Sequence, residues 1–138
     1  MRVAGLLLLL GLATGASADD DVRTNYLFAC RGCHLADGRG VPPDVPTLRD
    51  TLGDIVGRTG GREYLVRVPG VLQSRLDDDD LAAVLNYILT EFNADTLPDG
   101  FKPYSAREVG RARQKILADP QKYRQALLGE SVLDSALE

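Results

Sequence analysis

Two cysteines and a histidine stand together in the pentapeptide Cys30-Arg31-Gly32-Cys33-His34. This CxxCH spacing is the attachment signature of c-type haem, because two thiols three positions apart can bond to the two vinyl groups of one porphyrin. The histidine that follows is then held beside the iron as an axial ligand. The motif therefore predicts one covalent haem c, bound through Cys30 and Cys33 and ligated by His34.

A CxxC pair also occurs in disulfides, in thioredoxin-like redox proteins and in zinc sites. A short disulfide gives no reason for the adjacent histidine, and a thioredoxin-like pair requires a βαβ context that the glycine- and proline-rich residues after Leu35 do not offer. Structural zinc needs four ligands, drawn mainly from Cys and His. The chain has two cysteines and one histidine, so it cannot complete such a set alone.

The N-terminus has the form of a secretory signal peptide. Met1-Arg2 supplies a positive start, residues 3–14 are apolar, and Ala16-Ser17-Ala18 is a small-residue cleavage site. About a dozen apolar residues are fewer than the roughly 20 that cross a bilayer. We therefore expect a protein exported to the periplasm, with no stable membrane span after signal cleavage. Export also suits haem c, which bacteria attach outside the cytoplasm.

Helical periodicity dominates the rest of the chain, and no segment shows the alternation of a convincing strand. The clearest predicted helix follows the N-cap residue Asp77, with acidic residues in its first turn and an apolar stripe behind them. The glycines and prolines of residues 36–48 predict a loop. Further helices are predicted at residues 21–30, 50–56, 62–68 (ended by Pro69-Gly70), 105–118 and 121–128. The predicted fold class is all-α.

The order of elements over residues 30–92 resembles a class I (monohaem) cytochrome c: a helix into CxxCH, a glycine-proline loop, short helices and a final helix with an aromatic residue. After the predicted signal peptide at residues 1–18, the resemblance implies a cytochrome c-like helical fold around the haem at 19–100, which leaves residues 101–138 as a C-terminal helical extension. In this family a loop proline carbonyl accepts the proton of the axial histidine, and a leucine packs on the porphyrin. Pro46 and Leu48 fit these positions, and Tyr87 fits the aromatic that packs against the first helix.

The sequence departs from this family where a distal methionine ligand is expected. His34 is the only histidine, and the only methionine, Met1, lies in the predicted signal peptide. The expected position falls at Gly70 or Val71, so the iron could be five-coordinate, could hold water or a small gas, or could take an unusual protein ligand. Gln73 is the nearest polar side chain, and a hydrogen bond suits it better than ligation. Three further candidates from the C-terminal extension are Lys102, Tyr104 and Lys115.

We expect residues 101–128 to pack on the cytochrome core and help to shield the haem pocket. Their apolar residues need a surface to bury them, and the acidic front of the chain offers charge complementarity to their arginines and lysine. The residues concerned are Val109, Ile116, Leu117, Leu127 and Leu128, with Arg107, Arg111, Arg113 and Lys115 as the basic set.

Two functions suit such a chain. The resemblance favours an electron carrier, not an enzyme, that docks weakly with a periplasmic redox protein or dehydrogenase through the haem edge beside CxxCH. The missing methionine favours the alternative, a haem protein whose open distal site binds NO, CO or O2. Within this alternative, weak peroxidase activity is less expected than gas binding, because peroxidase turnover needs a distal base and the chain has no second histidine. The net charge of −4 offers no basic patch for nucleic acid.

Overall fold

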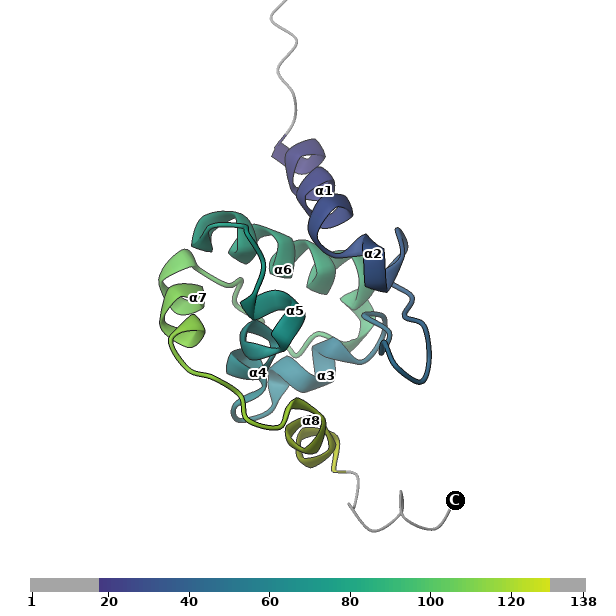
Figure 1. Cartoon of the computed structure of the whole chain (residues 1–138), viewed down its shortest axis with the longest axis vertical. Helices are drawn as coiled ribbons and strands as arrows, with labels where there is room; N and C mark the ends of the chain where they lie inside the picture. Colours follow the sequence, from purple (N-terminus) through teal and green to yellow (C-terminus); the bar gives the residue numbers. More distant parts are fainter. Residues whose placement is uncertain (1–17, 130–138) are drawn as a thin grey trace, which may run out of the picture.

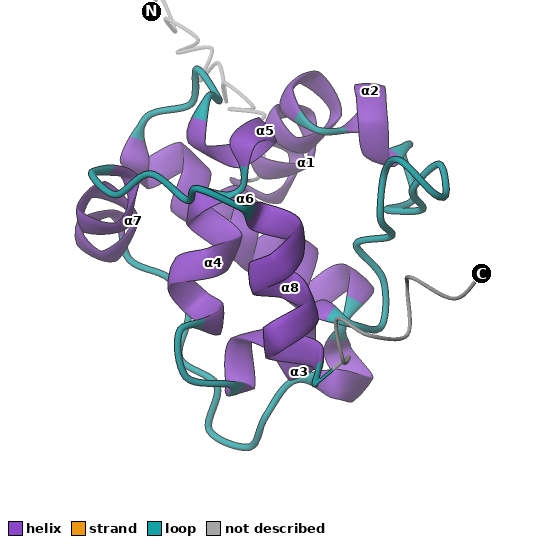
Figure 2. Ribbon diagram, turned by 60° about the horizontal axis from the view of Figure 1, so that its bottom comes forward, coloured by secondary structure: helices purple, strands orange, loops and turns teal. Residues whose placement is uncertain are grey.

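The computed structural model describes residues 18–129, which fold into short α-helices joined by loops (Figures 1 and 2). In chain order the elements are α1 (Ala18–Ala29), α2 (Arg31–His34), α3 (Leu52–Gly57), α4 (Gly61–Arg67), α5 (Pro69–Leu72), α6 (Asp78–Phe92), the 3-10 turn η1 (Ala94–Thr96), α7 (Ala106–Arg113) and α8 (Pro120–Leu128). Within these residues the only β-type pairing is an isolated bridge between Val41 and Val45. The predicted all-α class is confirmed. The predicted signal peptide lies outside the described residues except for Ala18.

No helix in the described part of the chain is both long and apolar enough to cross a membrane.

Helix α6 forms the centre of the core, as its sequence predicts. The Asp77 carboxylate accepts a hydrogen bond from the Asp80 N–H at 2.8 Å, which satisfies one of the free donors of the first turn. The three aspartates that follow lie in the first turn of α6, where negative charge interacts favourably with the positive end of the helix dipole. The apolar stripe is buried and comprises Leu81, Val84, Leu85, Ile88, Leu89 and Phe92.

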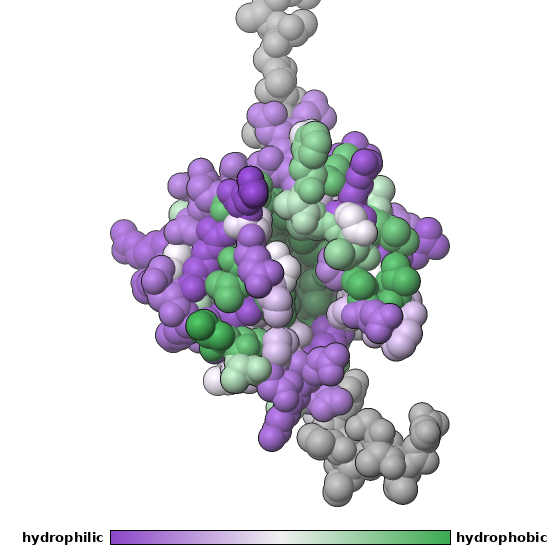
Figure 3. Space-filling model, viewed as in Figure 1, coloured by the Kyte–Doolittle hydropathy of each residue, from purple (hydrophilic) through white to green (hydrophobic). Residues whose placement is uncertain are grey.

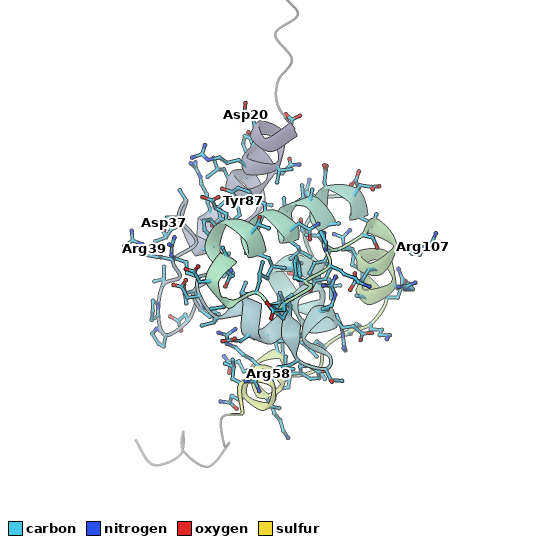
Figure 4. The ribbon with its side chains drawn as sticks, turned by 180° about the vertical axis from the view of Figure 1, so that it is seen from behind. Asp20, Asp37, Arg39, Arg58, Tyr87 and Arg107 are labelled. Carbon is cyan, nitrogen blue, oxygen red and sulfur yellow. The ribbon has the colours of Figure 1, made fainter. Side chains whose placement is uncertain are left out.

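Aromatic side chains fix α1 against the C-terminal half of α6. The Tyr26 ring lies 5.7 Å from the Tyr87 ring and 5.5 Å from the Phe92 ring, centroid to centroid, which is the usual range for aromatic pairs. The predicted contact of Tyr87 with the first helix is therefore confirmed, and Figure 4 shows Tyr87 on the side of α6 that faces α1. The Tyr26 hydroxyl donates to the Leu35 carbonyl at 2.6 Å, which ties α1 to the residue that follows CxxCH.

A buried amide holds the loop after CxxCH against the end of α6. Asn93 is only 1% exposed. Its side-chain oxygen accepts from the Leu52 N–H at 2.9 Å, and its nitrogen donates to the Leu48 carbonyl at 2.8 Å and the Ile88 carbonyl at 3.1 Å. This one side chain therefore links three segments, which are the loop, the first residue of α3, and α6.

The predicted helix at 62–68 ends before Pro69-Gly70 as expected, because α4 stops at Arg67 and Val68 is extended. Pro69 is then the first residue of the separate short helix α5, where its missing N–H costs nothing. One predicted helix boundary is wrong. Helix α7 ends at Arg113 and does not continue to residue 118. The reason is tertiary, because the Arg67 guanidinium bonds the backbone carbonyls of Lys115 (3.1 Å) and Ile116 (2.8 Å), which diverts the chain away from the helix axis.

The C-terminal extension packs on α4 and α6, and several of its predicted contacts are present. Val109 is fully buried and Leu127 is 7% exposed, whereas Ile116 is 82% exposed and its predicted burial is wrong. Arg113 pairs with Asp78 at 2.9 Å and Lys115 pairs with Glu63 at 3.1 Å. Arg107, by contrast, points from α7 into solvent (Figure 4). One salt bridge was not predicted: the Arg62 guanidinium on α4 donates hydrogen bonds to both carboxylate oxygens of Glu108 on α7, at 2.6 and 2.8 Å.

Candidate functional site

A cavity of about 700 Å³ opens in the middle of the molecule, within the range of about 300–1,000 Å³ that is typical of small-molecule sites (Figure 3). Its walls come from the CxxCH segment, residues 44–48, α4, α5, α6 and residues 118–124. Apolar side chains predominate, among them Leu48, Leu65, Val68, Val71 and Leu85. Such a lining suits a large apolar ligand.

Both cysteines of CxxCH line this cavity. Hydrogen bonds from the Cys33 N–H (3.2 Å) and the His34 N–H (3.0 Å) to the Cys30 carbonyl wind the segment into the tight turn of α2. Both thiols are free, with Cys30 half-buried and Cys33 exposed. Burial raises the pKa of the Cys30 thiol to about 11, so that this thiol is protonated at neutral pH. The thiols are thus available for bonds to a ligand in the cavity.

His34 also lines the cavity, and its ring is oriented by the loop. Its Nδ1 lies 3.1 Å from the Pro46 carbonyl, to which an Nδ1–H donates. This bond leaves Nε2 as the nitrogen that can bind a metal, and such a partner fixes the tautomer and raises ligand basicity. Burial lowers the pKa of His34, although the bond to Pro46 opposes the shift. The neutral ring that results is the ligating form.

The loop that carries Pro46 depends on a glycine that sequence reasoning missed. A Cβ at Gly40 would collide with the carbonyl groups of Val45 and Pro46. The Leu48 N–H donates to the Gly38 carbonyl at 2.8 Å, which closes the same loop. The glycine-rich composition of residues 36–48 was the only signal in the sequence, and it does not say which glycine is needed.

The wall formed by α5 and the turn after it carries no sulfur or imidazole among its described residues. It is lined by Pro69, Gly70, Val71 and Ser74. Gln73 is the C-cap residue of α5, and its backbone N–H donates to the Pro69 carbonyl. Its side chain is exposed and is not part of the cavity lining. The structure therefore does not bring Gln73 to the site. Arg113 holds this turn by donating to the Ser74 carbonyl at 2.9 Å.

The three candidates from the C-terminal extension also lie away from the cavity lining. Tyr104 is 4% exposed and its hydroxyl donates to the Arg62 carbonyl at 2.9 Å. The Lys115 ammonium is paired with Glu63, and Lys102 is exposed. The extension reaches the cavity through other residues, namely 118–121 and Arg124.

The residues present fit a covalently held haem. Two thiols and an imidazole from one pentapeptide enter a single cavity, whose walls are apolar and whose volume suits a large planar ligand. A haem held there by both cysteines would have His34 Nε2 as the nitrogen available to its iron. The hydrogen bond to Pro46 is the support that such a ligand requires.

Comparison with known proteins gives two relatives of high similarity, both named cytochrome c-552 and both from Thermus thermophilus. One is 37% identical over an alignment of 138 residues that covers 87% of this chain and 91% of the relative. The other is 36% identical over 110 residues, which cover 67% of this chain and 84% of the relative. No protein-family model matches the chain.

Proposed function

This chain belongs to the cytochrome c family, and on that premise we propose that it is an exported electron carrier that serves a periplasmic redox enzyme. It is an electron-transfer haem protein, and its cofactor is covalently bound haem c. The observation that carries the proposal is the meeting of both thiols and the imidazole of CxxCH in one apolar cavity.

Five of the sequence-predicted residues have a role in this proposal. Cys30 and Cys33 hold the porphyrin, His34 is the axial ligand, Pro46 orients it, and Leu48 packs on the macrocycle. Bound haem supplies a one-electron couple. The chain tunes that couple through the axial ligand, the hydrogen bond behind it and the apolar walls. Because Met/His ligation raises the potential of cytochromes c, a chain without a distal methionine is expected to have a lower one.

The CxxCH edge is the proposed point of electron exchange. Cys33 is exposed, and two large apolar side chains nearby in the sequence, Phe28 and Leu35, are 88% and 40% exposed. Weak redox encounters use small interfaces, for which a few exposed apolar groups beside the cofactor suffice. The partner is proposed to be a periplasmic redox protein or dehydrogenase.

Mass spectrometry tests the cofactor attachment and the export together. Expressed in a host that attaches haem c, the denatured protein should have the mass of a chain starting at Asp19 plus one haem. The Cys30→Ala, Cys33→Ala double variant is the matched control and should lack covalent haem. A wild-type chain mass without haem, from a host that loads other c-type cytochromes, would refute the proposal.

A second function, binding of a small neutral gas, is favoured by the composition of the site. No residue after Met1 is a methionine or a second histidine, and the α5 wall of the cavity is mainly apolar. The ferrous protein should therefore bind carbon monoxide readily, and the ferric protein should lack the weak near-infrared band of a methionine-iron bond. Absence of a carbon monoxide adduct would refute an open distal position and indicate a strong protein ligand.

A further inference from the structure

The chain leaves CxxCH through a backbone conformation that glycine adopts readily and other residues do not. Leu35 directly follows His34, and its φ of 57° and ψ of 172° lie at the edge of a region that is nearly restricted to glycine. A larger residue keeps such angles where the surrounding contacts hold it there. The contacts of Leu35 therefore indicate what fixes the segment next to the proposed axial ligand.

Both polar groups of the Leu35 backbone are hydrogen-bonded. The N–H donates to the Arg31 carbonyl at 3.0 Å, which closes the turn of α2. The carbonyl accepts from the Tyr26 hydroxyl at 2.6 Å. The Leu35 side chain is 40% exposed and is a weak anchor. The Tyr26 hydroxyl is therefore the side-chain group that holds this strained residue.

Tyr26 can hold Leu35 because its own position is fixed by packing. Its side chain is 0% exposed, and its ring contacts Tyr87 and Phe92 of α6. Burial raises the pKa of Tyr26 to about 12, so the hydroxyl is protonated and can donate at neutral pH. Figure 1 shows α1 leading directly into α2, so a residue before the motif holds the residue after it.

The conformation of Leu35 affects His34 because the two residues share a peptide group. The His34 ring is oriented by its Nδ1, which lies 3.1 Å from the Pro46 carbonyl. If Leu35 relaxed to a negative φ, the chain after His34 would change direction, and the loop that carries Pro46 would move relative to the ring. The Tyr26 hydroxyl therefore acts on the imidazole through Leu35.

We propose that Tyr26 is a positioning residue for the axial ligand, whose hydroxyl keeps Leu35 in the strained conformation that aligns the His34 ring. This inference rests on the proposed ligation of haem iron by His34. The chain has no second histidine and no methionine after Met1, so the iron depends on this one imidazole. A misaligned imidazole without its hydrogen bond to Pro46 donates less strongly to iron, which stabilises the ferric state less and raises the reduction potential.

Potentiometry of the holoprotein tests this with two matched tyrosines. Tyr26→Phe keeps the ring and removes the hydroxyl. It should shift the ferrous-to-ferric ratio toward ferrous by at least about threefold at fixed ambient potential, which is about 28 mV at 59 mV per tenfold change. Tyr87→Phe is the control, because Tyr87 belongs to the same aromatic cluster while the bond to Leu35 comes from Tyr26. It should leave the potential unchanged.

Replacing Leu35 with glycine tests the role of the strained conformation. Glycine adopts a positive φ about as readily as a negative one, so the segment then depends less on the hydroxyl. Tyr26→Phe should therefore shift the potential by less than half as much in a Leu35→Gly background as in the wild-type chain. A residue that merely stabilised the fold would lower the melting temperature in both backgrounds and leave the potential unchanged.

Three results would overturn the inference: a wild-type potential in Tyr26→Phe, an equal shift in Tyr87→Phe, or an undiminished shift in the Leu35→Gly background. If Tyr26→Phe does not fold, the double variant is compared with Leu35→Gly alone, and a ratio that differs by about threefold or more would overturn it. Mass spectrometry of every variant separates the two proposals, because a wild-type chain without covalent haem refutes the attachment itself.

Discussion

Replacing Asn93 with Ala should loosen the loop that supports His34 as well as destabilise the fold. The Asn93 side chain makes three hydrogen bonds, to Leu52, Leu48 and Ile88. Leu48 and Leu52 both line the cavity. Leu48 also lies two residues from Pro46, whose carbonyl orients His34.

The expected loss of stability comes from the backbone groups that lose their hydrogen-bond partner when Asn93 is replaced. The Leu52 N–H and the Leu48 carbonyl lose their bonds to Asn93, and an unsatisfied buried group costs about 1–3 kcal/mol. Water can reach the partly buried Leu48 carbonyl, so we expect a loss of about 3 kcal/mol from the free energy of unfolding. At about 4 °C per kcal/mol for a domain of this size, the melting temperature should fall by about 12 °C.

Urea denaturation of the holoprotein, followed by helical circular dichroism and by haem absorbance, measures this loss. Asn86→Ala is the matched control: Asn86 lies on the same helix but bonds the backbone of Tyr104, at 2.7 and 3.0 Å, and not the loop. It should destabilise the protein without altering the haem spectrum, whereas Asn93→Ala should alter both. A loss below about 1 kcal/mol for Asn93→Ala, or an unchanged haem spectrum, would contradict the role assigned to this amide.

Three further changes test the extension and the core. Ending the chain after Pro98 removes α7 and α8, and should speed carbon monoxide binding and lower the melting temperature; an unchanged spectrum and melting temperature would make the extension an independent tail. The Arg62 guanidinium lowers the pKa of Glu108 in the folded protein. The Arg62–Glu108 pair therefore stabilises the fold above the pKa of Glu108 in the unfolded chain, about 4.3, and this stabilisation is lost as the pH falls through the lower pKa of the folded state. Glu108→Gln should therefore cost about 1–2 kcal/mol in urea denaturation at neutral pH, and an equal cost in strong acid would show that charge is not the cause. Gly53→Ala should cost at least about 1–3 kcal/mol, because its Cβ would overlap the backbone of η1, whereas Gly32→Ala has no neighbour within 4 Å and should be neutral or slightly stabilising by thermal melting.

Local sequence patterns were sufficient to predict the all-α class and the residues that attach and ligate the haem. The helix Asp78–Phe92 was predicted from one capping aspartate and an apolar stripe, because both signals lie within the helix itself. The CxxCH motif needs one short turn to bring its groups together, so its chemistry can be read from spacing alone. Pro46 and Leu48 came from the resemblance, and the structure brings both to the same cavity.

Contacts distant in sequence account for what sequence reasoning missed. Helix α7 ends early because Arg67, 48 residues before Lys115, bonds its carbonyl. Gln73 was the nearest polar residue along the chain, yet its place at the end of α5 leaves it outside the cavity lining. Sequence distance says little about which way a side chain faces after a turn.

The sequence by itself determined the cofactor chemistry, the all-α class and the lack of a second histidine or of any methionine after Met1, because these depend on residue type and local spacing. Only the tertiary structure decided that a single buried amide, Asn93, fastens the loop behind His34. It also decided that Arg124, an ordinary helix residue in the sequence, lines the same cavity as the two cysteines. The physical reason is that burial and charge pairing depend on which helices pack together, and that choice is made by the whole core.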